Sequence, residues 1–199
     1  MQFWFEFAST YSYPAALRVE ALARRHGVPL EWKAFLLGPI FQAQGWNDSP
    51  FNLFPVQGRY MWRDLERICA DLELPFRRPG RFPQHSVLAA RIACQFASEP
   101  WLPDFVRAVF RANFAEDQDI AQPEVLEQCL NRLDLPGAEL LQQAQSPDGK
   151  ALLRAQTERA VALGIFGAPT FIVGDELFWG NDRLEAALAW ATRRAEPER

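Results

Sequence analysis

A strand, a helix and a second strand follow one another over residues 1–37, and this order limits the fold more than any other feature. Aromatic residues alternate around Glu6 over 3–7, which predicts a short first strand. Pro14 opens a run of helix-forming residues that ends at Gly27, and strand-forming residues return over 28–37. Such a unit predicts two parallel strands joined by a right-handed crossover.

The rest of the chain divides into helical and strand-like parts. Helices are expected over 60–71, 86–97, 101–114, 123–131 and 147–163. Strand patterns resume at 169–173 and 176–179, and the Gly174-Asp175 pair between them is typical of a hairpin turn. A last helix is expected over 181–190. The segment 38–55 is rich in Pro, Gly, Asn and aromatic residues, which predicts an ordered loop.

Two serines stand where the first strand meets the first helix, in Ser9-Thr10-Tyr11-Ser12. Serine is common at helix starts, so a plain capping role for Ser12 is one interpretation. The other rests on the positive N-terminal end of a helix, which lowers the pKa of a thiol placed there. Thioredoxin-type enzymes carry two cysteines at the corresponding place, and here both are replaced.

The sequence G-I-F-G-A-P-T-F, at 164–171, directly precedes the third predicted strand. A trans Pro169 at the start of a strand is the ordinary interpretation. The pattern also resembles the cis-proline element of the thioredoxin superfamily, which turns the backbone of the preceding residue outward. The N–H and C=O of Ala168 would then pair with an extended peptide.

We therefore expect an α/β, thioredoxin-like fold (β-α-β … β-β-α) with a large all-helical insertion between the second and third strands. The thioredoxin-like domain is expected over 1–56 and 164–199, and the inserted helical domain over 57–163.

Composition narrows the classes of function. Cys69, Cys94 and Cys129 stand far apart without CxxC spacing, which predicts inert thiols and no metal site. A net charge of −4 with only short basic clusters argues against a nucleic-acid partner. The chain shows no signal-peptide pattern and no apolar run long enough for a membrane span, so we expect a cytoplasmic protein without a membrane partner.

A third motif, F-W-G-N-D-R-L at 178–184, opens the last predicted helix. Asn181 and Asp182 suit a helix cap with a dipole-matching acid. The same helix start offers N–H groups to a carboxylate, while Asp182 suits an ammonium group. Together with F-W-F-E-F-A-S-T-Y-S-Y and G-I-F-G-A-P-T-F, this motif makes the chain resemble the 2-hydroxychromene-2-carboxylate isomerase family, which is related to kappa-class glutathione transferases and to the DsbA-like thioredoxin superfamily.

The resemblance implies that Ser9 is catalytic and contacts the sulfur of glutathione, the expected cofactor. It also implies which residues hold the tripeptide: Ser9, Ala168, Pro169, Trp179, Gly180, Asn181 and Asp182. Kappa-class relatives use an asparagine and a lysine in the segment that corresponds to 47–59. Asn47 or Asn52 would supply the first, whereas Gln57 stands in place of the lysine, with Arg59 nearby.

The substrate site is less specified. The candidate substrate-binding residues are Asn47, Asn52, Gln57 and His85, with an exposed position near a helix start as the alternative for His85. An aromatic wall is expected from a set of residues that would otherwise serve the core or an interface: Trp46, Phe51, Phe54, Tyr60 and Trp62. Arg77, Arg78 and Arg81 would attract a substrate carboxylate or simply form a solvated basic loop.

Four possible functions are weighed against these sequence features. The resemblance favours a glutathione-dependent isomerase, working as a homodimer, in which the glutathione thiolate is a transient nucleophile on an aromatic or unsaturated small-molecule substrate. A kappa-class-like glutathione transferase and a non-enzymatic glutathione-binding module are the alternatives. A disulfide oxidoreductase is excluded by Ser9 and Ser12, since its mechanism needs two thiols.

Overall fold

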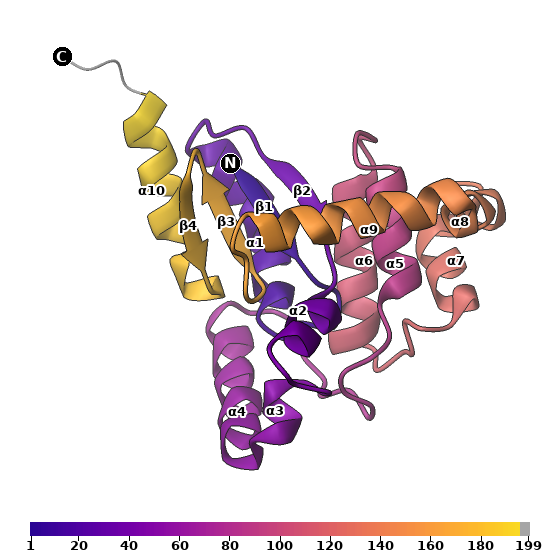
Figure 1. Ribbon diagram of the computed structural model, residues 1–199, viewed down its shortest axis with the longest axis horizontal. Coiled ribbons are helices and arrows are strands. Elements are labelled where there is room, and N and C mark those ends of the chain that lie inside the picture. Colours follow the sequence, from indigo (N-terminus) through magenta and orange to yellow (C-terminus); the bar gives the residue numbers. More distant parts are fainter. Residues whose placement is uncertain (196–199) are drawn as a thin grey trace.

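A four-stranded sheet in the order β2-β1-β3-β4 forms the centre of the molecule (Figure 1). The computed structural model describes residues 1–195. The strands are β1 (Gln2–Phe5), β2 (Glu31–Ala34), β3 (Thr170–Val173) and β4 (Glu176–Trp179). β1 and β2 are parallel, while β1–β3 and β3–β4 are antiparallel. The expected thioredoxin-like order, with its parallel first pair and its C-terminal hairpin, is therefore confirmed.

Ten α-helices and one short 3₁₀ helix lie among the described residues. Their bounds are α1 (Ser12–Arg25), α2 (Leu37–Ala43), α3 (Pro50–Leu53), α4 (Pro55–Asp71), α5 (Val87–Gln95), α6 (Leu102–Phe114), α7 (Pro123–Asn131), α8 (Gly137–Gln145), α9 (Pro147–Ala162), η1 (Asn181–Arg183) and α10 (Leu184–Ala195). The five helices expected between 57 and 164 are all present as α4, α5, α6, α7 and α9.

The two faces of the sheet are covered by different helices because side chains alternate along each strand. Phe3 and Phe5 belong to the main hydrophobic cluster, which also contains residues of α1, α6 and α10. Trp4 points the other way and packs with Ile40 of α2 and Ala160 of α9. Figure 1 shows α9 running across this second face.

Segment 38–55 differs from expectation, since α2 and α3 occupy most of it. α3 begins where the Ser49 hydroxyl accepts a hydrogen bond from the Phe51 N–H, with Pro50 at its first position. α3 packs closely on α4 at Gly58, where there is no room for a side chain: a Cβ on Gly58 would lie 2.2 Å from the Phe51 carbonyl oxygen. α2 and α3 are too short to leave a clear helical period in the sequence, and tertiary packing stabilises them.

α8 is a second element that the sequence pattern did not predict. It starts at Gly137, whose N–H donates to the Asn131 side chain, and it runs directly into the Ser146 that caps α9. Its buried residues, Gly137, Leu140, Leu141 and Ala144, share one face, but only the two leucines are strongly apolar, and packing against α5, α7 and α9 stabilises the helix.

The division into two domains stays a prediction. Its expected boundary at residue 57 lies within the first turn of α4. Within residues 1–195, no helix is both long enough and apolar enough to cross a bilayer.

Candidate active site

Ser9 lies in a tight turn that connects β1 to α1. The Ser9 N–H donates to the Glu6 carbonyl at 2.9 Å, which closes the turn directly after the strand. The Ser9 hydroxyl oxygen accepts the backbone N–H of Ser12, the first residue of α1, at 3.3 Å. Ser9 therefore occupies the N-terminal end of the helix, where backbone N–H groups concentrate positive partial charge.

The Ser9 hydroxyl also contacts the loop before β3. It donates a hydrogen bond to the Ala168 carbonyl oxygen at 2.9 Å, across 159 positions of sequence. The Ala168–Pro169 peptide bond is cis, as the motif predicted. The structure thus brings together the two motifs that the sequence placed at opposite ends of the chain.

This geometry determines what Ser9 can do. Its single hydroxyl hydrogen faces the Ala168 carbonyl, while its oxygen receives the Ser12 N–H. To stabilise a thiolate, the hydroxyl must turn its hydrogen from Ala168 toward the sulfur. That exchange replaces a neutral hydrogen bond by a charge-assisted one, which is the stronger type.

Ser12 differs from Ser9 in its surroundings. Its hydroxyl is buried and finds no hydrogen-bond partner among residues 1–195. Tyr11, not Ser12, precedes the helix, and neither caps it through a side chain. Ser12 is therefore part of the helix start and takes no part in the polar site.

A buried carboxyl, Glu6, lies beneath the turn. One of its oxygens accepts the Ala8 N–H at 3.1 Å, and the other is hydrogen-bonded to the Ser86 hydroxyl just before α5. Burial raises the pKa of Glu6 to about 7, although both hydrogen bonds act in the opposite direction. The aromatic pattern predicted Glu6 only as a strand residue, whereas β1 ends at Phe5; a lone acid within a run of aromatic residues is the signal that marks it.

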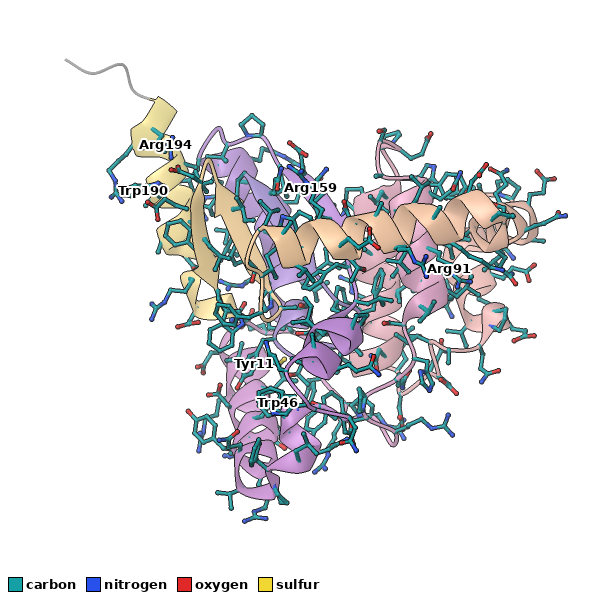
Figure 2. All side chains as sticks on the ribbon, viewed as in Figure 1. Tyr11, Trp46, Arg91, Arg159, Trp190 and Arg194 are labelled. Carbon is teal, nitrogen blue, oxygen red and sulfur yellow. The ribbon has the colours of Figure 1, made fainter. Side chains whose placement is uncertain are left out.

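Tyr11 forms the side of the turn that faces α4. Its hydroxyl donates to Asp64 of α4 at 2.9 Å, and its ring packs edge-on against Phe51. Burial, followed by the charges of Asp64 and Asp182, holds the pKa of Tyr11 above its usual range. Figure 2 shows Tyr11 at the junction between the sheet and α4. No sequence motif marks Asp64, because this residue approaches the turn only through the fold.

The F-W-G-N-D-R-L segment lies next to the cis-proline loop. The Gly180 N–H donates to the Pro169 carbonyl at 2.9 Å, and Gly180 has φ of 115°, which side-chain-bearing residues rarely adopt. Asn181 and Asp182 then form η1, which leads into α10. Asn181 is buried at 7 % exposure, whereas Asp182 is exposed.

Trp179 covers the loop from the outside. Its indole nitrogen would lie 2.4 Å from a Cβ on Gly167, so the glycine is needed for this close packing. The ring also packs against Phe166 with centroids 4.9 Å apart. Both rings stay about half exposed, which leaves an apolar surface beside Ala168 and Pro169.

The predicted substrate residues lie on α3, on α4 and in the adjoining loops. Asn47, Asn52, Gln57 and His85 are all exposed. The Asn52 side chain donates to Asp48 and to the Phe82 carbonyl, which ties α3 to the loop before α5. The structure does not gather these four residues into one hydrogen-bonded cluster.

The expected aromatic wall divides in two. Phe54 and Tyr60 are exposed at 47 % and 62 %, and Trp46 packs edge-on against Phe54, so these three can face a ligand. Trp62 is buried and packs against Phe82 and the Arg78 guanidinium. The interpretation of Trp62 as a core residue is the correct one.

The three cysteines are shielded, fully for Cys69 and Cys129 and in part for Cys94. Burial raises the pKa of Cys69 and of Cys94 to about 12, and that of Cys129 to about 11. A thiol with such a pKa is almost wholly protonated at neutral pH, so none of the three is suited to act as a nucleophile.

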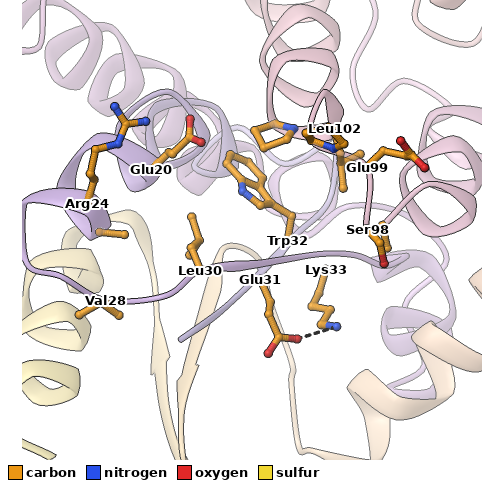
Figure 3. Close-up of a pocket in the computed structure, with 14 residues that line it drawn as sticks. Glu20, Arg24, Val28, Leu30, Glu31, Trp32, Lys33, Ser98, Glu99 and Leu102 are labelled. Atoms are coloured by element: carbon orange, nitrogen blue, oxygen red, sulfur yellow. Dashed lines mark ion pairs between the residues drawn. The ribbon is translucent and has the colours of Figure 1, made fainter. Parts of the chain in front are cut away.

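A separate groove of about 670 Å³ runs along the outer edge of β2 (Figure 3). It is lined by the C-terminal part of α1, by β2 and by the connection from α5 to α6. Its charges are partly paired, as in the Lys33–Glu31 ion pair at 2.8 Å. None of the residues predicted for the active site lines this groove.

Comparison with known proteins decides the family. A family model described as a DsbA-like thioredoxin domain matches residues 1–189. A 2-hydroxychromene-2-carboxylate isomerase of Sphingobium xenophagum is 31% identical over 186 residues, which cover 93% of this chain and 94% of that protein. This chain belongs to the 2-hydroxychromene-2-carboxylate isomerase family of DsbA-like proteins.

Two further relatives are similar to this isomerase-family chain over nearly its whole length. A solved 2-hydroxychromene-2-carboxylate isomerase superimposes with a TM-score of 0.81 at 27% identity and covers 97% of this chain and 96% of its own. A kappa 2 glutathione S-transferase of Caenorhabditis elegans is 25% identical and covers 92% of this chain and 88% of its own. The isomerase family and kappa-class transferases therefore share this DsbA-like architecture along nearly the whole chain.

Proposed function

We propose that this chain is a glutathione-dependent isomerase that acts on an aromatic or unsaturated small molecule resembling 2-hydroxychromene-2-carboxylate. The observation that carries the proposal is the position of the Ser9 hydroxyl, between the N-terminal end of α1 and the carbonyl of Ala168. Since burial shields the chain's own thiols, a thiol nucleophile would have to come from a bound molecule. The relatives that carry isomerase and kappa-class transferase names support the same choice.

The residues around Ser9 fit glutathione. The backbone at Ala168 and Pro169 and the surface of Trp179 and Gly180 suit its extended peptide part. The exposed carboxylate of Asp182 suits the γ-glutamyl ammonium group, and Asp182 lies close enough to the Ser9 turn to raise the pKa of Tyr11. Asn181, beside it, offers an amide to the γ-glutamyl carboxylate.

Ser9 and α1 would favour the ionised form of the sulfur. A thiol with a pKa near 8.5 is only about 3% thiolate at pH 7, and each tenfold gain in thiolate corresponds to about 1.4 kcal/mol. Bound glutathione supplies a thiolate nucleophile that adds reversibly to the substrate and is regenerated. The Ser9 hydroxyl donates to this sulfur without forming a mixed disulfide, and the N–H groups of α1 add positive potential.

The test compares Ser9→Ala with Ser12→Ala. Both changes remove one hydroxyl from the same turn, but only that of Ser9 faces the polar site. Ultraviolet absorbance of the bound thiolate should fall in Ser9→Ala, and turnover should fall by about a hundredfold, as for other donors to a developing anion. Ser12→Ala should keep both. Unchanged thiolate and turnover in Ser9→Ala would refute the role of Ser9.

A kappa-class-like transferase is the second candidate, favoured by the kappa-class relatives. Assays with chromene carboxylates and with chloronitrobenzenes separate the two, because only a transferase consumes glutathione. Binding without turnover on either panel would indicate a non-enzymatic glutathione-binding module. Trp46, Phe54 and Tyr60, together with Asn47, Asn52, Gln57 and His85, stay the predicted substrate surface. The homodimer and the cytoplasmic location stay predictions.

A further inference from the structure

Arg18 links α1 to the predicted γ-glutamyl site. It lies two turns into α1, and its side chain is only 18% exposed. One guanidinium nitrogen, Nη2, donates to Oδ1 of Asn181 at 3.0 Å. The other, Nη1, forms an ion pair with Glu185 of α10 at 2.7 Å. The motifs did not single out Arg18, which lies 163 positions from Asn181.

This contact decides which way the Asn181 amide faces. A guanidinium can only donate hydrogen bonds, so the carbonyl oxygen of the amide must point to Arg18. The amide nitrogen, Nδ2, then points away. Nδ2 donates no hydrogen bond to the part of the chain that the structure describes, and it is not enclosed, although Asn181 as a whole is 7 % exposed.

The arrangement is not optimised for stability. The Nε–H of Arg18 is buried and has no hydrogen-bond partner within residues 1–195. A buried donor without a partner destabilises the folded state. An apolar residue at this position of α1 would avoid that loss, whereas the guanidinium orients Asn181 and adds positive charge behind it.

We propose that Arg18 is a positioning residue for the γ-glutamyl carboxylate of glutathione, acting through Asn181. Arg18 holds Oδ1, which leaves the N–H groups of Nδ2 available to donate to the ligand carboxylate beside Asp182. This inference rests on the proposed use of glutathione. It identifies Arg18, acting through Asn181, as a determinant of the affinity for the γ-glutamyl end of glutathione. It predicts an effect on binding that is separate from the activation of sulfur at Ser9.

Calorimetric titration with glutathione tests the proposal through a double-mutant cycle. Arg18→Met and Asn181→Ala should each raise the dissociation constant about tenfold, the size expected for a hydrogen bond to a charged group. Because Arg18 acts through Asn181, adding Arg18→Met to Asn181→Ala should cause little further loss. The thiolate absorbance of glutathione at saturation should stay as in the wild type, since Ser9 is untouched.

Matched variants separate positioning from general effects. Arg24→Met removes another arginine from α1 and should change the dissociation constant less than about twofold. Glu185→Gln leaves the Arg18–Asn181 contact in place and should behave in the same way. Asn181→Asp keeps an acceptor for Arg18 but removes the amide donors, so it should weaken glutathione binding. This variant tests the proposal independently if Arg18→Met does not fold well.

The outcomes are distinct. Equal losses from Arg18→Met with and without Asn181 would show that Arg18 acts on its own, which overturns the proposal. Unchanged affinity in Arg18→Met or in Asn181→Asp, with normal binding by the wild type, would overturn it while leaving the proposed function standing. Failure of the wild type to bind glutathione would overturn both.

Discussion

Replacing Glu6 by glutamine tests how the buried carboxyl beneath the Ser9 turn affects stability. Glu6 is 6 % exposed, and its oxygens face the Ala8 N–H and the Ser86 hydroxyl. Burial raises its pKa from 4.5 to about 7, so the folded chain holds a proton that the unfolded chain releases more readily. The carboxyl is therefore a pH-dependent term in the free energy of unfolding.

The sign and size follow from the two pKa values. Below pH 4.5 the carboxyl is protonated in both states, and its contribution to stability is fully present. As the pH rises toward 7, the free energy of unfolding falls by about 1.4 kcal/mol per pH unit, to a loss of about 3 kcal/mol. A glutamine has no proton to release. Its amide can donate to Ser86 while its oxygen accepts the Ala8 N–H, so Glu6→Gln should be the more stable form above pH 7.

Urea denaturation from about pH 5 to about pH 8 measures this difference. The stability advantage of Glu6→Gln should grow with pH and shrink toward zero near pH 4.5. Glu158→Gln, an exposed change on α9, provides the control and should follow the wild-type curve. If Glu6→Gln showed the same dependence on pH as the wild type, the buried carboxyl would not be its source.

Three further predictions concern packing and reactivity. Asn113→Ala removes the buried hydrogen bond from the Asn113 side chain to the Phe7 carbonyl and should lower the free energy of unfolding by about 1–3 kcal/mol in a urea titration. Gly58→Ala places a Cβ 2.2 Å from the Phe51 carbonyl oxygen, so thermal denaturation should show a loss of about 1–3 kcal/mol as α3 shifts from α4. The three cysteines should react with a thiol reagent far more slowly in the native protein than in urea, because burial raises the pKa of each; fast native labelling would contradict this.

Most of the thioredoxin-like frame was predictable because its signals are local. The β3–β4 hairpin follows from two apolar runs around Gly174, which has φ of 64° in the turn. α7 begins at Pro123 and ends at Asn131, as its proline start and polar end predicted. Such elements need only their own residues and a general tendency to bury an apolar face.

Elements that depend on packing against the rest of the fold were not predicted from the sequence. α3 has four residues, and the buried face of the nine-residue α8 has only two large apolar side chains, so both are helical mainly through their neighbours. The candidate site shows the same division. Ser9, Ala168 and Asn181 lie in recognisable motifs, whereas Asp64 and Arg18 lie within ordinary helical sequence and reach the site only through the fold.

Three contacts that shape the candidate site join the first 18 residues to distant parts of the chain. Ser9 bonds to Ala168 across 159 positions, Glu6 to Ser86 across 80, and Arg18 to Asn181 across 163. None of these contacts is enforced by local sequence, so each exists only when the sheet and its covering helices are packed. Changes at Glu6 should therefore act on stability and changes at Arg18 on ligand affinity. Ser9→Ala should lower stability modestly, because it removes two hydrogen bonds, and should lower turnover far more than that loss explains. If changes at Glu6, Arg18 and Ser9 all lowered stability, glutathione affinity and turnover together, the Ser9 turn would have only a structural role, and its hydroxyl would have no separate chemical role.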